Sequence, residues 1–344
     1  MKRQGGKKVY VGMSGGVDSS VAAALLKKQG YEVTGVFMKP WQPDFAMDGE
    51  LCLWKQDRED ALRAASAIGI PLLTWDFSKE YKKAVTDYMI REYRAGRTPN
   101  PDVMCNKEIK FGIFLKKALK EGADYIATGH YVRRKGSKLY QAKDKNKDQS
   151  YFLWTLTPEQ VKRSLFPIGD YEKPEVRKLA KKFGLPNHAK KDSQGVCFIG
   201  PLDMKEFLQE YIKPKPGKVI HTDGRVLGTH DGVYYYTIGQ RHGLNLSIAG
   251  GPYYVVGKDI KKNIIYVGDD AAASSPTAQV GEFNWLDPKK PANLSVKVRY
   301  RAPSVRAILK GSQLVFAKPE RAVTSGQSAV FYSGQRLIGG GIIL

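Results

Sequence analysis

One short segment constrains the fold of this chain more than any other, a glycine-rich run between an apolar stretch and a helical pattern. The apolar stretch covers residues 9–13, and the run reads Gly12-Met13-Ser14-Gly15-Gly16-Val17-Asp18-Ser19-Ser20. Residues 19–29 then carry apolar side chains at helical spacing. Glycines let the backbone turn tightly and direct successive N–H groups at an anion, and the helix adds its positive end. The segment therefore predicts a strand, a loop and a helix that together bind a phosphate or pyrophosphate group.

The loop by itself leaves three interpretations open, of which phosphate binding is the first. It is not a Walker-type loop, because no Gly-Lys-Ser/Thr follows at the required distance. Residues 12–16 do match the G-x-S-x-G nucleophile elbow of hydrolases, although that serine normally follows several strands. A plain strand–turn–helix connection is the third interpretation. If a nucleotide binds, Ser19 is expected to cap the helix or donate to phosphate oxygens, and Asp18 to hold Mg²⁺ or orient the loop.

Strand-like and helix-like segments alternate through the first part of the chain. Further strands are predicted at 31–38, 71–77 and 124–128, and helices at 57–68, 79–95 and 107–120. Two more helices are predicted at 173–183 and 202–211. Repeated strand–helix units indicate an α/β fold with a doubly wound, Rossmann-like parallel sheet.

The pattern changes after the basic, proline-rich breaker at residues 213–217. Short strand-like runs follow at 233–238, 253–256 and 264–267, and a small-residue linker is expected at 271–277. Four more runs lie at 294–300, 305–309, 314–317 and 329–332. Evenly spaced short strands indicate a small β-rich central domain and a C-terminal β-barrel-like domain. We therefore expect domains at 1–205, 206–275 and 276–344.

The chain is strongly basic, with 56 Lys and Arg against 34 Asp and Glu and a formal charge of +22. Such a field attracts polyanions, and nucleic acid is the expected partner, with a merely solvated basic surface as the alternative. No run approaches the roughly 18 apolar residues that span a bilayer, and no basic amphipathic helix indicates a membrane surface. The basic first residues precede no apolar signal core. We expect a soluble, cytoplasmic protein.

Three cysteines, Cys52, Cys105 and Cys197, are too few and too far apart for a disulfide framework or a zinc site, so no metal site is expected. Cys105 follows a turn with two prolines and lies near the expected start of a helix at about Lys107, which would lower the pKa of its thiol. A small buried cysteine is the alternative. Cys197 lies in a glycine-flanked loop after two lysines, and Cys52 is interpreted as structural.

The Ser14-Gly15-Gly16-Val17-Asp18-Ser19 sequence resembles the PP-loop of the ATP pyrophosphatases, which adenylate a substrate and release pyrophosphate. This superfamily includes synthetases for GMP, NAD and argininosuccinate as well as tRNA thiolases. The resemblance implies that ATP, with Mg²⁺, is bound by the loop and by residues at the ends of two other strands. The implied nucleotide contacts are Gly12, Met13, Ser14, Gly15, Gly16, Val17, Asp18, Ser19, Met38 and Gly129.

Further motifs resemble the bacterial tRNA-specific 2-thiouridylases nearly end to end, in order and in spacing. These motifs are Gly96-Arg97-Thr98-Pro99-Asn100-Pro101-Asp102 with Cys105-Asn106, Lys147-Asp148-Gln149-Ser150-Tyr151-Phe152-Leu153, the Cys197 loop, Thr237-Ile238-Gly239-Gln240-Arg241 and Gly339-Gly340-Gly341-Ile342-Ile343. One departure is Ser325, where the family usually has proline before Gly-Gln; it affects only the stiffness of that turn.

The resemblance implies a role for each of the matching residues. Cys197 would carry a persulfide, Cys105 would attack it or form a disulfide with Cys197 after transfer, and Asp102 would assist proton transfer. Asn100, Pro101 and Asp102 would contact the target uridine. The implied tRNA contacts are His130, Lys147, Asp148, Gln149, Arg299, Tyr300 and Gln327. Without the resemblance, each of these has an ordinary structural interpretation, such as a solvated turn, a hydrogen-bonded loop histidine or a strand face.

The substrates implied by the family are the tRNAs for Lys, Glu and Gln, with sulfur relayed as a persulfide from a cysteine desulfurase. Three other hypotheses stay open. Another PP-loop ligase would explain the loop but leave both cysteine motifs and the positive charge without a role. A hydrolase would use the Gly12–Gly16 elbow, and an RNA-binding module would contain an inert loop.

Overall fold

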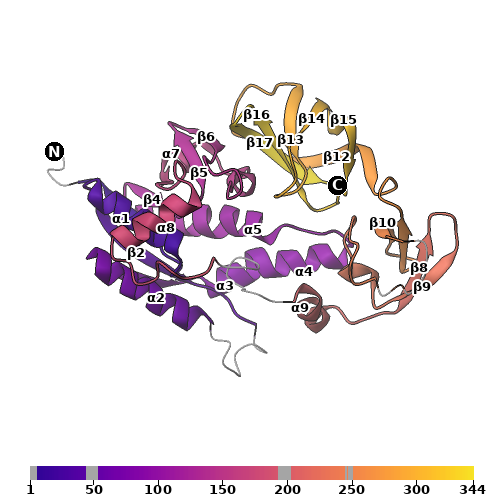
Figure 1. The fold of residues 1–344 in the computed structure, drawn as a ribbon, viewed down its shortest axis with the longest axis horizontal. Coiled ribbons are helices and arrows are strands. Elements are labelled where there is room, and N and C mark those ends of the chain that lie inside the picture. Colours follow the sequence, from indigo (N-terminus) through magenta and orange to yellow (C-terminus); the bar gives the residue numbers. More distant parts are fainter. Residues whose placement is uncertain (1–5, 44–52, 193–202, 245, 247–250) are drawn as a thin grey trace. The chain divides into compact units, whose positions relative to one another are not determined.

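The computed structural model describes residues 6–43, 53–192, 203–244, 246 and 251–344 (Figure 1). These residues form two compact units. Unit 1 comprises Met1–Val85, Pro101–Pro201 and Gln335–Ile338, and unit 2 comprises Thr86–Asn100, Leu202–Gly334 and Gly339–Leu344. Within the described residues, no helix is long and apolar enough to cross a membrane.

Unit 1 is built on a parallel sheet whose five strands have the order β3-β2-β1-β4-β7. Their bounds are β3 (Leu72–Asp76), β2 (Glu32–Lys39), β1 (Lys8–Gly12), β4 (Tyr125–Ala127) and β7 (Ser164–Leu165). Each neighbouring pair is parallel. The order reverses direction at β1, which places the loop after β1 at the switch point where open α/β sheets bind ligands.

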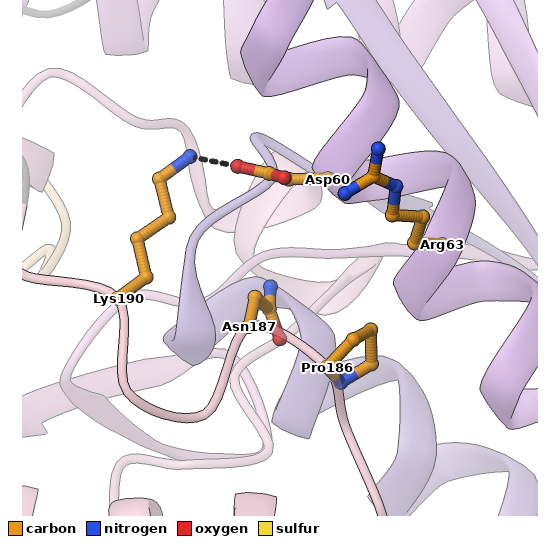
Figure 2. A pocket seen from close by; sticks show the side chains of 5 residues that line it. All are labelled: Asp60, Arg63, Pro186, Asn187 and Lys190. Carbon is orange, nitrogen blue, oxygen red and sulfur yellow. Dashed lines mark hydrogen bonds and ion pairs between the residues drawn. The ribbon is translucent and has the colours of Figure 1, made fainter.

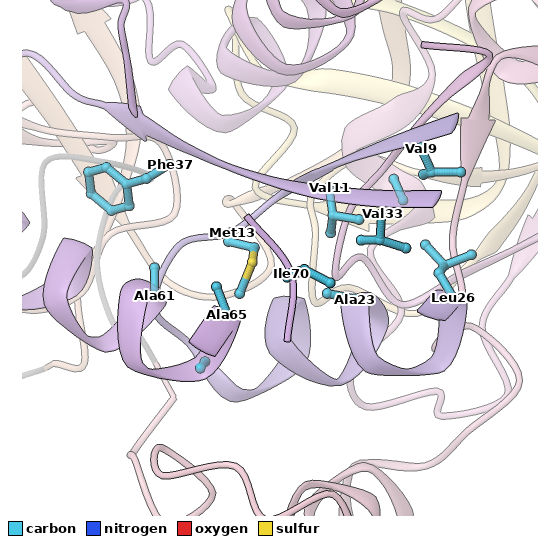
Figure 3. Close-up of a cluster of buried hydrophobic side chains, with 12 residues drawn as sticks. Val9, Val11, Met13, Ala23, Leu26, Val33, Phe37, Ala61, Ala65 and Ile70 are labelled. Carbon is cyan, nitrogen blue, oxygen red and sulfur yellow. The ribbon is translucent and has the colours of Figure 1, made fainter. Parts of the chain in front are cut away.

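Side chains alternate between the two faces of the sheet, and each face is covered by helices. On one face, Val9 and Val11 of β1 and the following Met13 pack against α1 (Val17–Lys28) and α2 (Leu53–Ile68), whose alanines allow close approach (Figure 3). On the other face, the rings of Trp75 and Phe114 lie 5.8 Å apart, and Phe114 begins α6 (Phe114–Lys120). The predicted doubly wound α/β sheet is therefore confirmed.

The first 200 residues contain further helices and strands. Helix α8 (Lys173–Lys182) packs on α1 through Val176 and Ala180. The predicted helix 79–95 is a continuous helical stretch of α3 (Ser78–Tyr81), the π-helical η2 (Lys82–Thr86) and α4 (Asp87–Arg94). The remaining elements are α5 (Pro101–Met104), π-helical η3 (Cys105–Ile113), β5 (Val132–Lys135), β6 (Lys138–Gln141), η4 (Ser150–Leu153) and α7 (Pro158–Lys162).

Unit 2 contains two β structures. After α9 (Met204–Tyr211), a four-stranded sheet has the order β10-β11-β8-β9, with β10 (Tyr254–Asp259), β11 (Ile264–Gly268), β8 (Gly217–His221) and β9 (Val226–His230). The second structure is an antiparallel barrel that closes where β12 pairs with β17. Its strands are β12 (Ser274–Trp285), β13 (Asn293–Lys297), β14 (Val305–Lys310), β15 (Gln313–Arg321), β16 (Ser328–Ser333) and β17 (Arg336–Ile343). The expected β-rich and barrel domains are both present.

Three expectations about these β structures were wrong in detail. The run 233–238 is not a strand but begins with a 3₁₀ turn, η5 (Val233–Tyr235), because Val233 and Tyr236 both bury against the sheet core without strand pairing. The linker expected at 271–277 is shorter, since β12 begins at Ser274. The strand expected at 294–300 ends at Lys297, which leaves Arg299 and Tyr300 in the following turn.

Candidate active site

The glycine-rich loop joins β1 to α1 at the carboxyl edge of the parallel sheet, as predicted. Gly15 has φ +75°, a left-handed backbone that favours glycine, and Gly16 precedes the helix in an extended conformation without a side-chain cap. The Ser19 hydroxyl accepts a hydrogen bond from the Ser14 N–H at 3.2 Å and donates to the Gly16 carbonyl at 3.2 Å. The hydroxyl therefore ties the loop to the first turn of α1, where backbone N–H groups favour an anion.

Backbone packs directly on backbone at two glycines of this site. A Cβ on Gly15 would lie 2.2 Å from the Asp57 carbonyl oxygen of α2, and a Cβ on Gly129 would lie 2.6 Å from the Ser19 nitrogen. Met38, buried at the end of β2, reaches within 3.0 Å of the place where a Gly12 Cβ would stand. The structure thus brings together Gly12, Met38 and Gly129 around the loop, although these residues are far apart in the sequence.

Asp18, at the start of α1, is held by two partners that the sequence did not suggest. The Tyr131 hydroxyl donates to its carboxylate at 2.9 Å, and the Lys173 ammonium lies 2.8 Å away. Burial and the Asp18 charge raise the pKa of Tyr131 well above its ordinary value, so the phenol keeps its proton and acts as a donor. In this structure, Tyr131 and Lys173 thus hold the Asp18 carboxylate in place. Among the described residues, no group of three or more His, Cys, Asp or Glu could hold a metal ion.

Lys173 also links Asp18 to a second carboxylate, that of Asp192. The Lys173 ammonium is 2.7 Å from Asp192, which is also paired with Lys147 at 2.6 Å and Arg177 at 2.8 Å. Burial acts to raise the pKa of Asp192, but the hydrogen bonds from Lys147 and Lys173 outweigh it and lower this pKa to about 2. Asp192 is therefore ionised and held by three cations. It is the last described residue before the segment 193–202, so Cys197 lies outside the described residues.

The other side of the loop is supported by Asn187, which is 6% exposed. Its amide donates to the Gly15 carbonyl at 2.9 Å and to the Ser20 hydroxyl at 3.0 Å. Asn187 also lines a pocket of about 250 Å³ with Asp60 and Lys190, and the Lys190 ammonium pairs with the Asp60 carboxylate at 2.6 Å (Figure 2). Asn187 was missed because an isolated asparagine gives no sequence signal; only the fold brings it to Gly15.

The helix that carries Cys105 begins earlier than expected. It starts at Pro101, because proline is pre-organised for the first helical position, and not near Lys107. Cys105 is fully buried at the start of the π-helical stretch η3. The positive helix end therefore lies at Pro101 and Asp102, and Cys105 lies inside the helix and not before its start. π-Helical turns are frequent at functional sites.

Of the residues expected to contact the target base, Asn100, Pro101 and Asp102 are all partly exposed, whereas Val103 and Cys105 are buried. The Asp102 carbonyl accepts a hydrogen bond from the Asn106 amide at 2.9 Å, which fixes the first turn. Asp102 precedes the buried thiol by three residues, less than one helical turn, whereas Pro101 and Asn100 precede it by four and five residues.

In unit 1, the residues expected to contact tRNA differ in burial and in hydrogen-bond partners. His130 is 7% exposed, lies 5.8 Å from the Phe111 ring and pairs with the Thr128 hydroxyl at 2.8 Å. Burial, with Lys110 nearby, lowers the pKa of His130 well below its ordinary value, so it is neutral. Asp148 is buried and accepts hydrogen bonds from Ala142 and Ser150, and the Gln149 side chain accepts one from the Tyr131 N–H.

In unit 2, Arg299 and Tyr300 are partly exposed in the turn after β13. The Gln327 amide donates to the backbone carbonyls of Thr98 at 2.9 Å and Pro99 at 3.3 Å. Gln327 therefore contacts the segment before Asn100.

Comparison with known proteins covers the whole chain. Profiles described as the tRNA methyl transferase HUP domain, the tRNA methyl transferase PRC-barrel domain and the aminomethyltransferase beta-barrel domain match residues 7–201, 205–269 and 275–343. The tRNA-specific 2-thiouridylase MnmA 2 of Geobacillus kaustophilus is 49% identical, with 98% of this chain and 94% of that protein covered. The tRNA-specific 2-thiouridylase MnmA of Akkermansia muciniphila is 47% identical, with 97% and 98% covered.

Two solved structures are more distantly similar. The NMN synthetase of Francisella tularensis is 16% identical with a TM-score of 0.36, covering 59% of this chain and 72% of its own. A 4-thiouridine synthetase in complex with RNA and ATP is 21% identical with a TM-score of 0.35, covering 59% and 50%. These scores are too low to bear on function. The full-length identity to the named relatives shows that this chain belongs to the tRNA-specific 2-thiouridylase family.

Proposed function

We propose that this chain is a tRNA-uridine 2-sulfurtransferase, which uses ATP to replace the C2 oxygen of the wobble uridine with sulfur. The observation that carries the proposal is its identity of 47–49% to 2-thiouridylases over nearly the whole length of both proteins. The profile descriptions name a methyltransferase for the same domains. A PP-loop-like turn favours adenylation over methyl transfer, because it presents backbone N–H groups to phosphate oxygens.

Activation is the first step. The uridine C2 oxygen attacks the α-phosphorus of ATP, forming a C2–O–AMP bond, and pyrophosphate leaves. The N–H groups of the Ser14–Ser19 loop and the start of α1 would hold the phosphates, with Gly12, Met38 and Gly129 beside the nucleotide. Mg²⁺ would accompany ATP, coordinated largely by phosphate oxygens and water. Asp18, already neutralised by Lys173, would keep the loop in place.

Sulfur transfer is the second step. The terminal sulfur of a Cys197 persulfide attacks C2, and AMP leaves with the original oxygen. The Cys105 thiolate then attacks the Cys197 sulfur, which forms a Cys105–Cys197 disulfide and leaves sulfur on C2 with the electron pair of the broken S–S bond. Asp102 would assist proton transfer, and Asn100 and Pro101 would hold the base. A thiol reductant and a persulfide donor, fed by a cysteine desulfurase, would regenerate the enzyme.

The substrate would be tRNA, in particular the tRNAs for Lys, Glu and Gln. The net charge of +22 suits a phosphate backbone, and an anticodon-loop base must be extruded to reach a nucleotide site. Lys147, Asp148, Gln149 and His130 in unit 1, and Arg299, Tyr300 and Gln327 in unit 2, would contact or organise the contacts to this RNA.

Nucleoside mass spectrometry tests the proposal. Each of these tRNAs is incubated with the protein, ATP, Mg²⁺ and a sulfide or persulfide source, and the nucleosides are analysed. We expect 2-thiouridine and stoichiometric AMP and pyrophosphate. In a parallel incubation with S-adenosylmethionine, a methylated nucleoside would instead support the profile descriptions. Pyrophosphate release triggered by a small metabolite without tRNA would support a different PP-loop ligase.

Cysteine variants test the sulfur-transfer step. We expect Cys105→Ser and Cys197→Ser to abolish thiolation while tRNA-dependent pyrophosphate release continues, because activation requires neither thiol. Cys52→Ser is the matched control and should thiolate at the wild-type rate. Full thiolation by either of the first two variants would contradict the mechanism.

A further inference from the structure

The segment before Asn100 is held by a loop of the C-terminal barrel, and all of these contacts lie within unit 2. The Thr98 N–H donates to the Ser325 carbonyl at 2.8 Å. The Gln327 amide returns two hydrogen bonds, to the carbonyls of Thr98 at 2.9 Å and Pro99 at 3.3 Å. Because Thr98 and Pro99 are both buried, these carbonyls depend on the barrel loop for their partners.

Gly326, between Ser325 and Gln327, makes this approach possible. Its φ is +90°, and a Cβ there would lie 2.9 Å from the Thr98 carbonyl carbon and oxygen. The loop itself is fixed to the last strand, since the Gly326 N–H donates to the Ile343 carbonyl and the Ile343 N–H donates to the Gln327 carbonyl, both at 2.8 Å. The contact surface on the barrel side is therefore rigid.

Two further contacts hold the same segment from the side of the central domain and α4. The Thr98 and Thr237 hydroxyls are 3.2 Å apart, and Thr237 opens one of the motifs to which the proposed reaction gives no role. The Arg97 guanidinium binds both carboxylate oxygens of Glu92, which is 8% exposed. Charge-assisted bidentate pairs of this kind fix geometry well.

The backbone from Thr98 to Asp102 has little conformational freedom. Pro99 and Pro101 have fixed φ angles, and Thr98 and Asn100 each precede a proline, which restricts their own backbone to extended conformations. Pro101 then enters a helix directly. Fixing Thr98 and Pro99 therefore fixes the backbone of Asn100, the last residue of unit 2 before Pro101.

On the basis of the proposed function, we propose that Gly326 and Gln327 are positioning residues, which hold Asn100 in place for its contact with the target base. Gln327 was expected to contact tRNA. Its amide binds the protein backbone instead, so that it acts on the base through Asn100. We therefore expect the barrel loop to affect the rate of the chemical step more than the affinity for RNA.

The first test needs no substrate. Hydrogen exchange of the peptide covering residues 95–100 is compared in wild type, Gln327→Met and Gly326→Ala. Methionine keeps the side-chain length but removes both amide donors. We expect the Thr98 amide to exchange about tenfold faster in each variant, because local opening becomes easier. Gly311→Ala is the matched control, since Gly311 lies in the same barrel at φ +61° with nothing within 4 Å of a Cβ.

The second test measures thiolation and tRNA affinity for the same four proteins. We expect kcat to fall by about tenfold to a hundredfold in Gln327→Met and Gly326→Ala, since a misplacement of about 1 Å has this effect, with Kd for tRNA within about twofold of wild type. Gly311→Ala should retain the wild-type kcat, which separates positioning from barrel strain.

Two results would overturn the inference. One is wild-type exchange at Thr98 in Gln327→Met; the other is a Kd raised about tenfold with kcat unchanged, which would make Gln327 an RNA contact alone. Wild-type protein that forms no 2-thiouridine would instead contradict the proposed function, and the exchange comparison would still decide whether the barrel loop holds Thr98.

Discussion

Substitution of Gly15 by alanine tests whether the close contact between the loop and α2 sets the activity. The new Cβ would stand 2.2 Å from the Asp57 carbonyl oxygen, whereas an ordinary contact begins at 3.4 Å. Both partners are backbone atoms, so neither can rotate away. The loop must move by about 1 Å, and a misplacement of that size costs about a hundredfold in rate, or about 3 kcal/mol. The φ of +75° adds about 1–2 kcal/mol of strain to the folded state.

Gly30→Ala separates strain from displacement. Gly30 follows α1 with φ +85°, and nothing lies within 4 Å of a Cβ there. This variant should lose about 1 kcal/mol of unfolding free energy by backbone strain alone and keep its full rate of pyrophosphate release. Thermal unfolding measures the first quantity, and tRNA-dependent pyrophosphate release measures the second. Equal rates in the two variants would refute the reasoning, because the Asp57 contact would then have no effect on the loop.

Three other predictions concern charge: two concern ionised side chains beside the loop, and the third concerns the net positive charge of the chain. Lys173→Met should lower the free energy of unfolding by about 2–4 kcal/mol in urea titrations, because it leaves Asp18 and Asp192 without their shared ammonium. Lys143→Met is the control. It breaks only the exposed pair with Glu175 and should have no measurable effect. The folded-state pKa of Asp192, about 2, is lower than its ordinary value, so its contribution should be fully present above about pH 4 and lost as the pH falls towards 2. Asp192→Asn should remove that part of the pH dependence, and an identical acid profile in the variant would contradict the assignment. The affinity for tRNA should fall steeply between low and moderate salt in filter-binding titrations, and a flat response would argue against a phosphate-backbone interface.

The sequence by itself determined the fold class and the glycine-rich loop between β1 and α1. Both depend on local signals: alternating apolar runs and helical spacing define the parallel sheet, and glycines between β1 and α1 define the turn. The strand prediction was wrong where an apolar run is buried without strand pairing, as at Val233 and Tyr236. The predicted helix start near Cys105 was also wrong, because Pro101 already begins the helix.

Only the tertiary structure decided which residues hold the glycine-rich loop and the segment before Asn100. Asn187, Tyr131 and Lys173 contact the loop from more than 100 positions away, and no spacing rule connects them to it. Gln327 has a recognisable motif, but its hydrogen bonds to Thr98 and Pro99 exist only because the barrel loop folds against that segment. Local sequence encodes backbone conformation, whereas these partners are chosen by long-range packing, which brings distant side chains to one backbone.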